Sequence, residues 1–206
     1  PVRVFCCGRT DSGVHAIEQV IHFETETSRT NNAWLFGGNV NLPSDVNFTW
    51  AKEVAEDFHA RFNAYARSYE YKIHNNPIRS SLKTNYYLWE PRKLNIIEMK
   101  KAVSFLVGEH DFSCFRGRLC QAKTPIKTIE YIDIIESNDE LILKIKANAF
   151  LHHMVRNIVG TVLKIGRGEK DAEWILSVLD SKDRRKAGPT AEPQGLYFIK
   201  AFYENL

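Results

Sequence analysis

The order of its strand-like and helix-like segments constrains the fold of this chain most strongly. Residues 65–73 alternate with a period of two, which is typical of a strand with one face towards a core. The residues on that face are Tyr65, Arg67, Tyr69, Tyr71 and Ile73. Two more strands are expected at 128–136 and 141–147, on either side of the turn at 137–139. Consecutive strands joined by a short turn favour antiparallel pairing.

Helix-like segments are also present, but they do not alternate strictly with the strands. Between residues 151 and 165 apolar residues recur at steps of four and three, which predicts a helix packed on a core with Arg156 at the edge of its apolar stripe. Other helices are expected at 31–40 (interrupted by Gly37-Gly38), 96–106 and 172–179, and other strands at 2–7, 19–25, 46–54 and 195–202. This mixture predicts an α+β fold, a largely antiparallel mixed sheet flanked by helices.

Composition sets broad limits on what the chain does. With 206 residues, 44% of them hydrophobic, it is long enough to bury one large core or two packed halves. The net charge of +3 and pI near 8.7 are compatible with an RNA partner but do not single one out. Because no run of about 18 apolar residues or signal-peptide pattern is present, we expect no membrane span and a cytoplasmic location.

The chain has four cysteines, Cys6, Cys7, Cys114 and Cys120. None of them forms a C-x-x-C pair, the spacing that would indicate zinc or a redox motif. We therefore expect reduced thiols that serve mainly in packing.

The loop GRTDSGVHA at residues 8–16 is the strongest candidate for chemistry. Its carboxylate, Asp11, has Arg9 two residues before it and glycines on either side, where the backbone turns sharply and a ligand approaches closely. Asp11 is therefore a candidate nucleophile or base, held ionised by Arg9 or another cation. The alternative is a turn in which Asp11 only hydrogen-bonds its own backbone.

Other charged or ligating groups favour no single function. His152 and His153 are adjacent and no third ligand is placed by spacing, so a structural or RNA-facing role is favoured over a metal site. The basic run at 182–186 and four basic residues between 116 and 127 fit phosphate contacts and a solvated surface equally well.

Several ordered motifs give the chain a family resemblance. The loop GRTDSGVHA resembles the catalytic loop of the TruA-type tRNA pseudouridine synthases. The resemblance continues through QVIHFE (19–24), NLP (41–43), DFHARF (57–62), RSYEY (67–71), GEHDF (108–112), IKANAFLHHMVRNIVG (145–160) and GLY (195–197). It covers nearly the whole chain and is far more specific than any one short pattern.

The resemblance implies a role for five residues. Asp11 is the essential aspartate, Tyr69 contacts or stacks on the target base, and Arg156 pairs with Asp11. Leu196 lines the pocket, and Arg9 helps to hold the target nucleotide flipped out. The implied substrates are uridines 38, 39 and 40 of the tRNA anticodon arm, and the implied assembly is a homodimer that binds tRNA.

The implied reaction explains why few groups are needed. Converting uridine to pseudouridine breaks the bond from C1′ to N1 and makes one from C1′ to C5, without redox change or hydrolysis, so no metal or organic cofactor is expected. Asp11 serves either by attacking C1′ or by removing a proton from C2′, and the sequence does not choose between these routes. An arginine within about 4 to 6 Å would keep the carboxylate charged, and an aromatic platform such as Tyr69 suits a base that leaves its stack.

The chain departs from the family pattern at its beginning. Members of this type carry a strand and helix with a Y-D-G and G-W-Q type segment before the catalytic loop, and these are missing here. We therefore expect the pseudouridine-synthase fold of two similar halves, 1–88 (incomplete, with the catalytic loop) and 89–206, with a cleft between them. The activity of residues 1–206 alone is not predicted.

Two rival functions follow from the same residues. One is a catalytically inactive tRNA-binding protein of this fold, although a pure binder has no need of a carboxylate beside RNA phosphates. The weaker one is a metal-dependent hydrolase using Asp11, His152 and His153, which chelators would inhibit.

Overall fold

The computed structural model describes residues 2–204 and 206. Its internal contacts divide the chain into two compact units. The smaller unit consists of Pro1–Cys7 and Val20–Asn63, and the larger unit of Gly8–Gln19 and Ala64–Leu206. The expected division into halves at residue 88 stays a prediction.

The smaller unit contains a short antiparallel pair and one helix. Strands β1 (Phe5–Cys6) and β3 (Ile21–His22) lie within the strands expected at 2–7 and 19–25, but each is shorter than expected, and the two pair in antiparallel fashion. The imidazole of His22 stacks on Phe5 with ring centroids 4.9 Å apart, and its Nδ1 accepts a hydrogen bond from the Ala60 N–H. Helix α1 (Asn31–Asn39) begins at Thr30, whose hydroxyl oxygen accepts from the Ala33 N–H.

Two expectations for the smaller unit were wrong. Helix α1 runs through Gly37-Gly38 without interruption, since a glycine in a helix costs only about 1 kcal/mol. Residues 46–54 form no strand. The side-chain amide of Asn39 donates to the Phe48 carbonyl and accepts from its N–H, so it takes the backbone groups that a neighbouring strand would bond.

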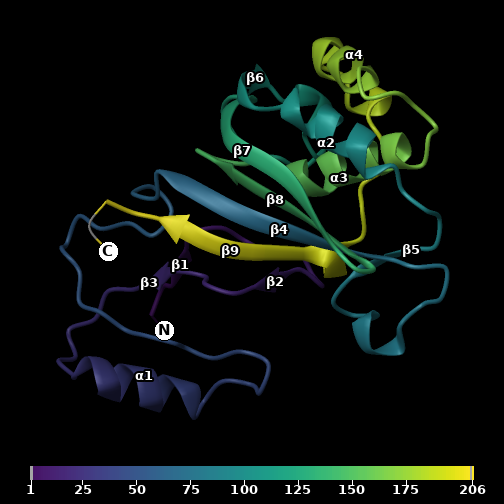
Figure 1. The fold of residues 1–206 in the computed structure, drawn as a ribbon. Helices are drawn as coiled ribbons and strands as arrows, with labels where there is room; N and C mark the ends of the chain where they lie inside the picture. The colour runs from purple at the N-terminus through teal and green to yellow at the C-terminus, as the bar shows by residue number, and fades with distance from the viewer. Residues whose placement is uncertain (1, 205) are drawn as a thin grey trace. The chain divides into compact units, whose positions relative to one another are not determined.

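The larger unit is built on a seven-stranded mixed sheet (Figure 1). The strands lie in the order β2 (His15–Ala16), β9 (Leu196–Phe202), β4 (Ala66–Asn75), β8 (Glu140–Ala147), β7 (Ile126–Ser137) and β6 (Gly108–Asp111). Strand β5 (Leu88–Glu90) pairs with the end of β4. Only β2 with β9 and β5 with β4 run parallel, so the predicted largely antiparallel sheet is confirmed.

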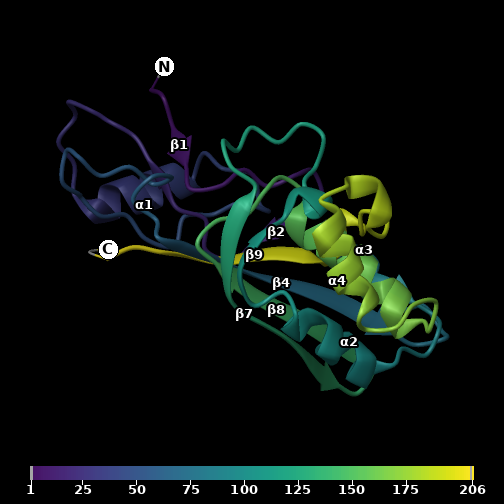
Figure 2. The ribbon, with the colours of Figure 1, turned by 90° about the horizontal axis from the view of Figure 1, so that it is seen from above.

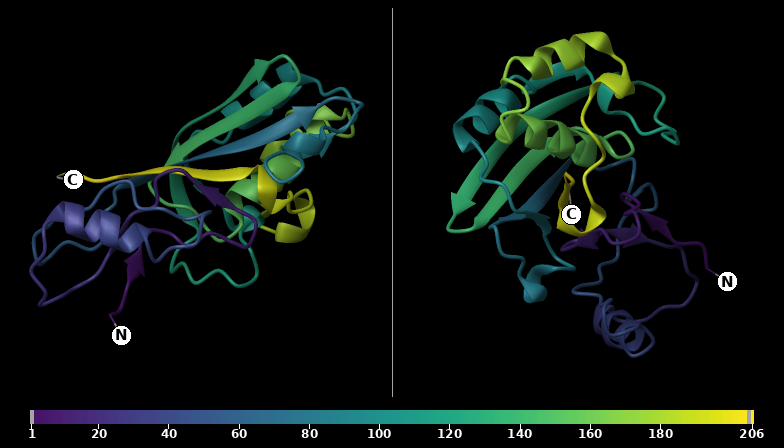
Figure 3. Two further views of the ribbon diagram at one scale, coloured as in Figure 1. Left: turned by 90° about the horizontal axis from the view of Figure 1, so that it is seen from below. Right: turned by 90° about the vertical axis from the view of Figure 1, so that its right-hand side faces the viewer.

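Three helices cover one face of this sheet. They are α2 (Ile96–Ser104), α3 (Met154–Gly166) and α4 (Trp174–Ser181), and Figures 1 and 2 show them on the same side of the strands. Apolar residues of β4, β8 and α3, including Tyr71, Leu143 and Ile158, are buried between the layers. Figure 3 shows this layering from two further sides. The described residues also include four short 3₁₀ segments: η1 (Ser81–Lys83), η2 (Ser113–Phe115), η3 (Arg184–Lys186) and η4 (Pro193–Gly195).

Helix α3 begins later than its apolar periodicity predicts. The Met154 N–H bonds the Leu151 carbonyl, which closes a turn over His152 and His153. His153 takes a left-handed backbone conformation, with φ of 61°. Because a non-glycine residue rarely adopts this conformation, the turn points the two imidazoles in a direction that a regular helix would not allow.

Two simpler expectations concern the cysteines and the membrane. All four cysteines are free thiols, as predicted. Within the described part of the chain, every helix is too short or too polar to cross a membrane.

Candidate active site

The loop that carries Asp11 is anchored at both of its ends. The Gln19 side chain donates to the Gly8 carbonyl over 2.6 Å and accepts from the Gly8 N–H over 3.4 Å. At the other end, β2 pairs with Tyr197 and Phe198 of β9. A hydrogen bond from the Val14 N–H to the Asp11 carbonyl closes a tight turn in which Gly13 has φ of 80°, a conformation that glycine adopts without strain.

The carboxylate of Asp11 forms the ion pair that the family resemblance implied. Nη1 of Arg156 donates to Oδ2 of Asp11 over 2.9 Å. Nε of the same guanidinium donates to the Ala191 carbonyl over 2.8 Å, which fixes the orientation of the arginine. The Asp11 side chain is 32% exposed and the Arg156 side chain 13%, so the pair is shielded from solvent but within reach of a ligand. The two groups are therefore in direct contact, and their catalytic roles stay predictions.

Two histidines contact the same carboxylate. Nε2 of His153 lies 3.1 Å from Oδ2 of Asp11, and Nε2 of His152 lies 3.4 Å from Oδ1. Their rings stack with centroids 3.8 Å apart. Because a carboxylate only accepts hydrogen bonds, the His153 nitrogen that bonds Asp11 carries its hydrogen.

The environment of His153 favours its neutral form. Burial lowers the pKa of His153, and His152 and Arg156 lower it further, while Asp11 opposes the shift. At neutral pH the imidazole is therefore uncharged. Asp11 is thus held by one cation, Arg156, and by His153 as a neutral donor.

Tyr69 and Gly8 bring β4 close to the loop. The ring of Tyr69 packs edge-on against Phe150 and Phe198, with centroids 4.9 and 5.2 Å away. A methyl group at Gly8, the first residue of the loop, would lie 3.9 Å from the Tyr69 hydroxyl oxygen. A register shift between Ser68 and Tyr69 in the pairing with β9 occurs at the same place, and such irregularities often redirect a side chain near a site.

The other two predicted site residues differ in exposure. Leu196 begins β9, pairs with Tyr71 and is only 7% exposed. Arg9 is exposed, as expected for a residue whose implied role is to act on a bound nucleotide. Asp11 and Arg156 are thus in direct contact, Tyr69 lies beside the loop, and the roles of Tyr69, Leu196 and Arg9 stay predictions.

Comparison with known proteins shows the family of this chain. The sequence profile of the family described as tRNA pseudouridine synthase matches residues 102–204. The chain is 48% identical to tRNA pseudouridine synthase A of Hydrogenovibrio crunogenus over 203 residues, 98% of this chain and 78% of the relative. The protein of the same name from Pseudomonas aeruginosa is also 48% identical, over 98% of this chain and 71% of the relative.

A third protein of this name, from Methylococcus capsulatus, is 47% identical over 96% of this chain and 73% of the relative. The chain belongs to the tRNA pseudouridine synthase A family. Membership rests on whole-chain similarity, whereas the contacts of Asp11 are properties of this structure.

In this tRNA pseudouridine synthase, the position of His152 depends on a glycine far away in the sequence. The Gly117 N–H donates to the His152 carbonyl over 2.8 Å, and a methyl group at Gly117 would lie 2.8 Å from His152 Nδ1. The His152 N–H in turn donates to Sγ of Cys120 over 3.3 Å. The segment containing Gly117 and Cys120 therefore holds His152 against Asp11. Sequence reasoning missed this role for the two histidines, and the only available signal was their adjacency before the helix.

The same three residues form the one group of possible metal ligands found among residues 2–204 and 206. One ligand atom each from Asp11, His152 and His153 lie within 4.8 Å of one another. Two imidazoles and a carboxylate form a donor set that zinc accepts, and Asp11 supplies the third ligand that sequence spacing did not. However, the Arg156 guanidinium already bonds Oδ2 and places a positive charge next to the carboxylate, which would repel a cation. The donor set therefore fits a hydrogen-bonded carboxylate better than a metal ion.

Proposed function

We propose that Asp11 is the catalytic carboxylate of the reaction that this family performs. As a tRNA pseudouridine synthase, the chain catalyses the isomerisation of uridine to pseudouridine in tRNA. The observation that carries the assignment of Asp11 is its contact with Arg156 at 2.9 Å in a loop held at both ends. Such anchoring fixes the position of a reactive group before the substrate binds.

The contacts of the carboxylate favour one of its oxygens for the chemistry. Oδ2 interacts with both Arg156 and His153, at 2.9 and 3.1 Å. Oδ1 has only the longer contact of 3.4 Å with His152. Since lone pairs engaged in short hydrogen bonds are less available, Oδ1 is the oxygen that attacks C1′ or takes the C2′ proton. Both routes use this same oxygen.

The remaining roles concern the uridine that leaves its stack. Tyr69 serves as the surface for the target base, because its ring is fixed by Phe150 and Phe198. Leu196 borders the base, and Arg9 holds the displaced nucleotide from the exposed side of the loop. The resemblance of the motifs supports uridines 38, 39 and 40 as targets, a homodimer as the binding form, a cytoplasmic location, and catalysis without metal or cofactor.

The experiment that tests this function separates it from both rivals. Full-length protein is incubated with tRNA carrying tritium at C5 of uridine, and release of tritium to water is followed, because only bond formation at C5 displaces that hydrogen. We expect release with turnover, and the same rate with and without EDTA. A protein that binds tRNA without release would be an inactive binder, and a release that EDTA abolishes would indicate a metal-dependent enzyme.

A further inference from the structure

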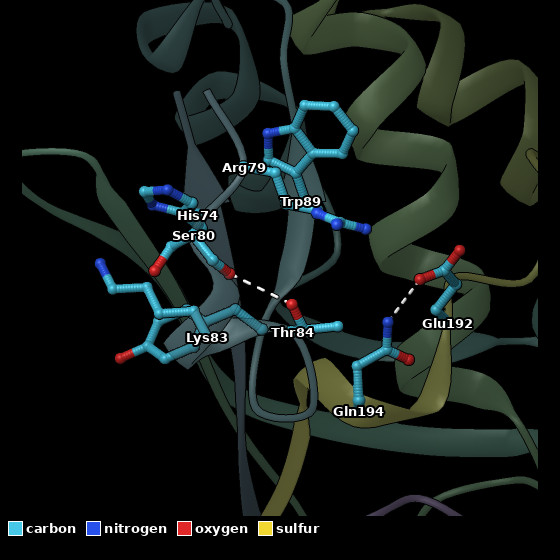
Figure 4. A pocket seen from close by; sticks show the side chains of 9 residues that line it. His74, Arg79, Ser80, Lys83, Thr84, Trp89, Glu192 and Gln194 are labelled. Atoms are coloured by element: carbon cyan, nitrogen blue, oxygen red, sulfur yellow. Dashed lines mark hydrogen bonds between the residues drawn. The ribbon is translucent and has the colours of Figure 1, made fainter. Parts of the chain in front are cut away.

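A hollow lies on the larger unit beside His74, near the C-terminal end of β4 (Figure 4). It has a volume of about 190 Å³ and is lined by the end of β4, the loop at 79–87, β5 and the segment 192–194. We call it the β4–β5 cavity. It is smaller than clefts that hold a whole drug-sized ligand, about 300 to 1,000 Å³, so it suits one residue of a larger ligand.

The cavity presents a free cation and a fixed aromatic ring. Arg79 is exposed and has no ion-pair partner among the described residues. The indole of Trp89 is 41% exposed, and its Nε1–H donates to the Asn76 carbonyl over 2.8 Å, which holds the ring in place. An arginine beside an aromatic face is the pair of groups with which proteins bind unpaired nucleotides, through phosphate and base respectively.

The other charged lining residues are already engaged. Lys83 pairs with Glu140 over 2.7 Å, and Glu192 bonds the Gln194 side chain, as the dashed line in Figure 4 shows. The charges of Lys83 and Glu140 cancel each other, whereas Glu192 bonds a neutral amide and keeps its negative charge. The cavity has one cation available for an anion.

A buried histidine adds an independent sign of a ligand. His74 lines the cavity and is 6% exposed, yet its Nδ1 has no hydrogen-bond partner in the described structure. Buried polar atoms without a partner are rare in native proteins, and each needs an explanation such as a bound molecule. A polar group bound in the cavity would provide that partner.

One segment of chain connects the cavity to the active site. Ala191 accepts the hydrogen bond from Arg156, Pro193 would contact a side chain placed at Gly13, and Glu192 and Gln194 line the cavity. From Tyr69 to His74 the strand advances five residues, about 17 Å. A polynucleotide bound at Asp11 is long enough to span this distance.

We propose that the β4–β5 cavity binds one unpaired nucleotide of the tRNA whose target uridine lies at Asp11, with its phosphate on Arg79 and its base against Trp89. This inference rests on the proposed function, because it assumes that tRNA is the substrate. Neither comparison with relatives nor the motifs assign these residues a role. The site would add affinity for tRNA without taking part in bond making.

The test measures kcat and KM by tritium release, and Kd for tRNA in a separate binding assay. Arg79→Ala and Trp89→Ala should each raise KM and Kd about tenfold, with kcat within twofold. Arg79→Lys and Trp89→Phe should recover most of the loss, because they keep the charge and the ring. The slope of log Kd against log salt should decrease by about one for Arg79→Ala. Lys100→Ala on α2 removes a charge elsewhere and should change neither constant.

Several results would overturn the proposal. If both alanine variants had the KM and Kd of the wild type, tRNA would not use the cavity. An altered oligomeric mass with unchanged Kd would also contradict the proposal, because it would indicate that a protein occupies the cavity. A mixture of free nucleoside monophosphates that changes the kcat of the wild type but not of Arg79→Ala would indicate a free nucleotide instead. If the wild type released no tritium, the proposed function would fail, while the Kd comparison would still decide whether the cavity binds RNA.

Discussion

The two ends of β4 carry sites that differ in how their polar groups are used. At the Tyr69 end, the carboxylate of Asp11 is already bound by Arg156, His152 and His153. At the His74 end, Arg79 has no ion-pair partner and His74 Nδ1 no hydrogen-bond partner among the described residues. The first site holds its reactive group by an ion pair, although His152 Nδ1 there also has no hydrogen-bond partner among the described residues, whereas the second site leaves its arginine without an ion pair. This difference predicts that the first acts on the rate of chemistry and the second on affinity.

The largest effect that would distinguish the two sites comes from their arginines. Arg156→Ala should lower kcat about a hundredfold or more, because the Asp11 carboxylate loses the group that neutralises and orients it. Arg79→Ala is the matched variant and should change KM instead. Arg156→Lys should recover little, since a single ammonium does not reproduce contacts to both Asp11 and the Ala191 carbonyl. Similar changes in kcat and KM for Arg156→Ala and Arg79→Ala would remove the distinction.

A smaller effect is expected at Gly117. A methyl group there would lie 2.8 Å from His152 Nδ1 and 2.9 Å from the His152 carbonyl oxygen, so His152 must shift from its position beside Asp11. Gly117→Ala should lower kcat about tenfold while the protein stays folded, as checked by steady-state kinetics and circular dichroism. Gly37→Ala is the control, because nothing lies within 4 Å of its added methyl group. An unchanged kcat would mean that His152 does not support the carboxylate.

Tyr71 lies between the two sites and should affect both slightly. Its hydroxyl group is buried and donates to the Glu192 carbonyl over 2.6 Å. Tyr71→Phe leaves this carbonyl unpaired, which should cost about 1 kcal/mol and lower the Tm by about 2 to 4 °C. Because segment 191–196 serves both sites, kcat and KM should each change by less than about fivefold. Tyr131→Phe, at an exposed position, should leave the Tm unchanged.

The smallest expected effect is a pH dependence of stability. The pKa of His153 is lowered in the folded protein, so the unfolded chain binds this proton more readily. The contribution of His153 to the free energy of unfolding is therefore complete above the ordinary histidine pKa of about 6.5. It decreases as the pH falls through the lower pKa that His153 has in the folded protein. His153→Asn removes the titration and keeps a residue that tolerates the left-handed backbone.

Urea unfolding between pH 7 and 5 measures this effect. The variant should lose less stability than the wild type over that range, and His110→Asn serves as a control outside the site. An identical pH dependence in His153→Asn and the wild type would contradict the assignment.

The periodic elements could be predicted from sequence, and the site only in part. Strands β4 and β8 and helix α3 have faces buried against a common core, so their apolar spacing is visible in the sequence. The region 46–54 alternates in the same way, but hydrogen bonds with the Asn39 side chain replace strand pairing there. A side chain that takes the hydrogen bonds of a strand in this way does not change the apolar spacing of the sequence.

The spacing of residues in the sequence does not predict the contacts of Asp11 either. Its pairing with Arg156, 145 positions away, was implied by the resemblance and not by any local pattern. The approach of His153 depends on its left-handed backbone, and the β4–β5 cavity depends on an irregular loop. Neither feature has a sequence signature that physical reasoning could have used.

The most direct test of the central claim is single-turnover tritium release by Asp11→Asn at saturating tRNA, with Kd measured on the same sample. The amide is nearly isosteric but is a poor nucleophile and base, so release should decrease at least about a thousandfold while Kd stays within a few-fold of wild type. Asp180→Asn on α4 controls for loss of one exposed carboxylate and should match the wild type. Release by Asp11→Asn at more than a tenth of the wild-type rate would contradict the account.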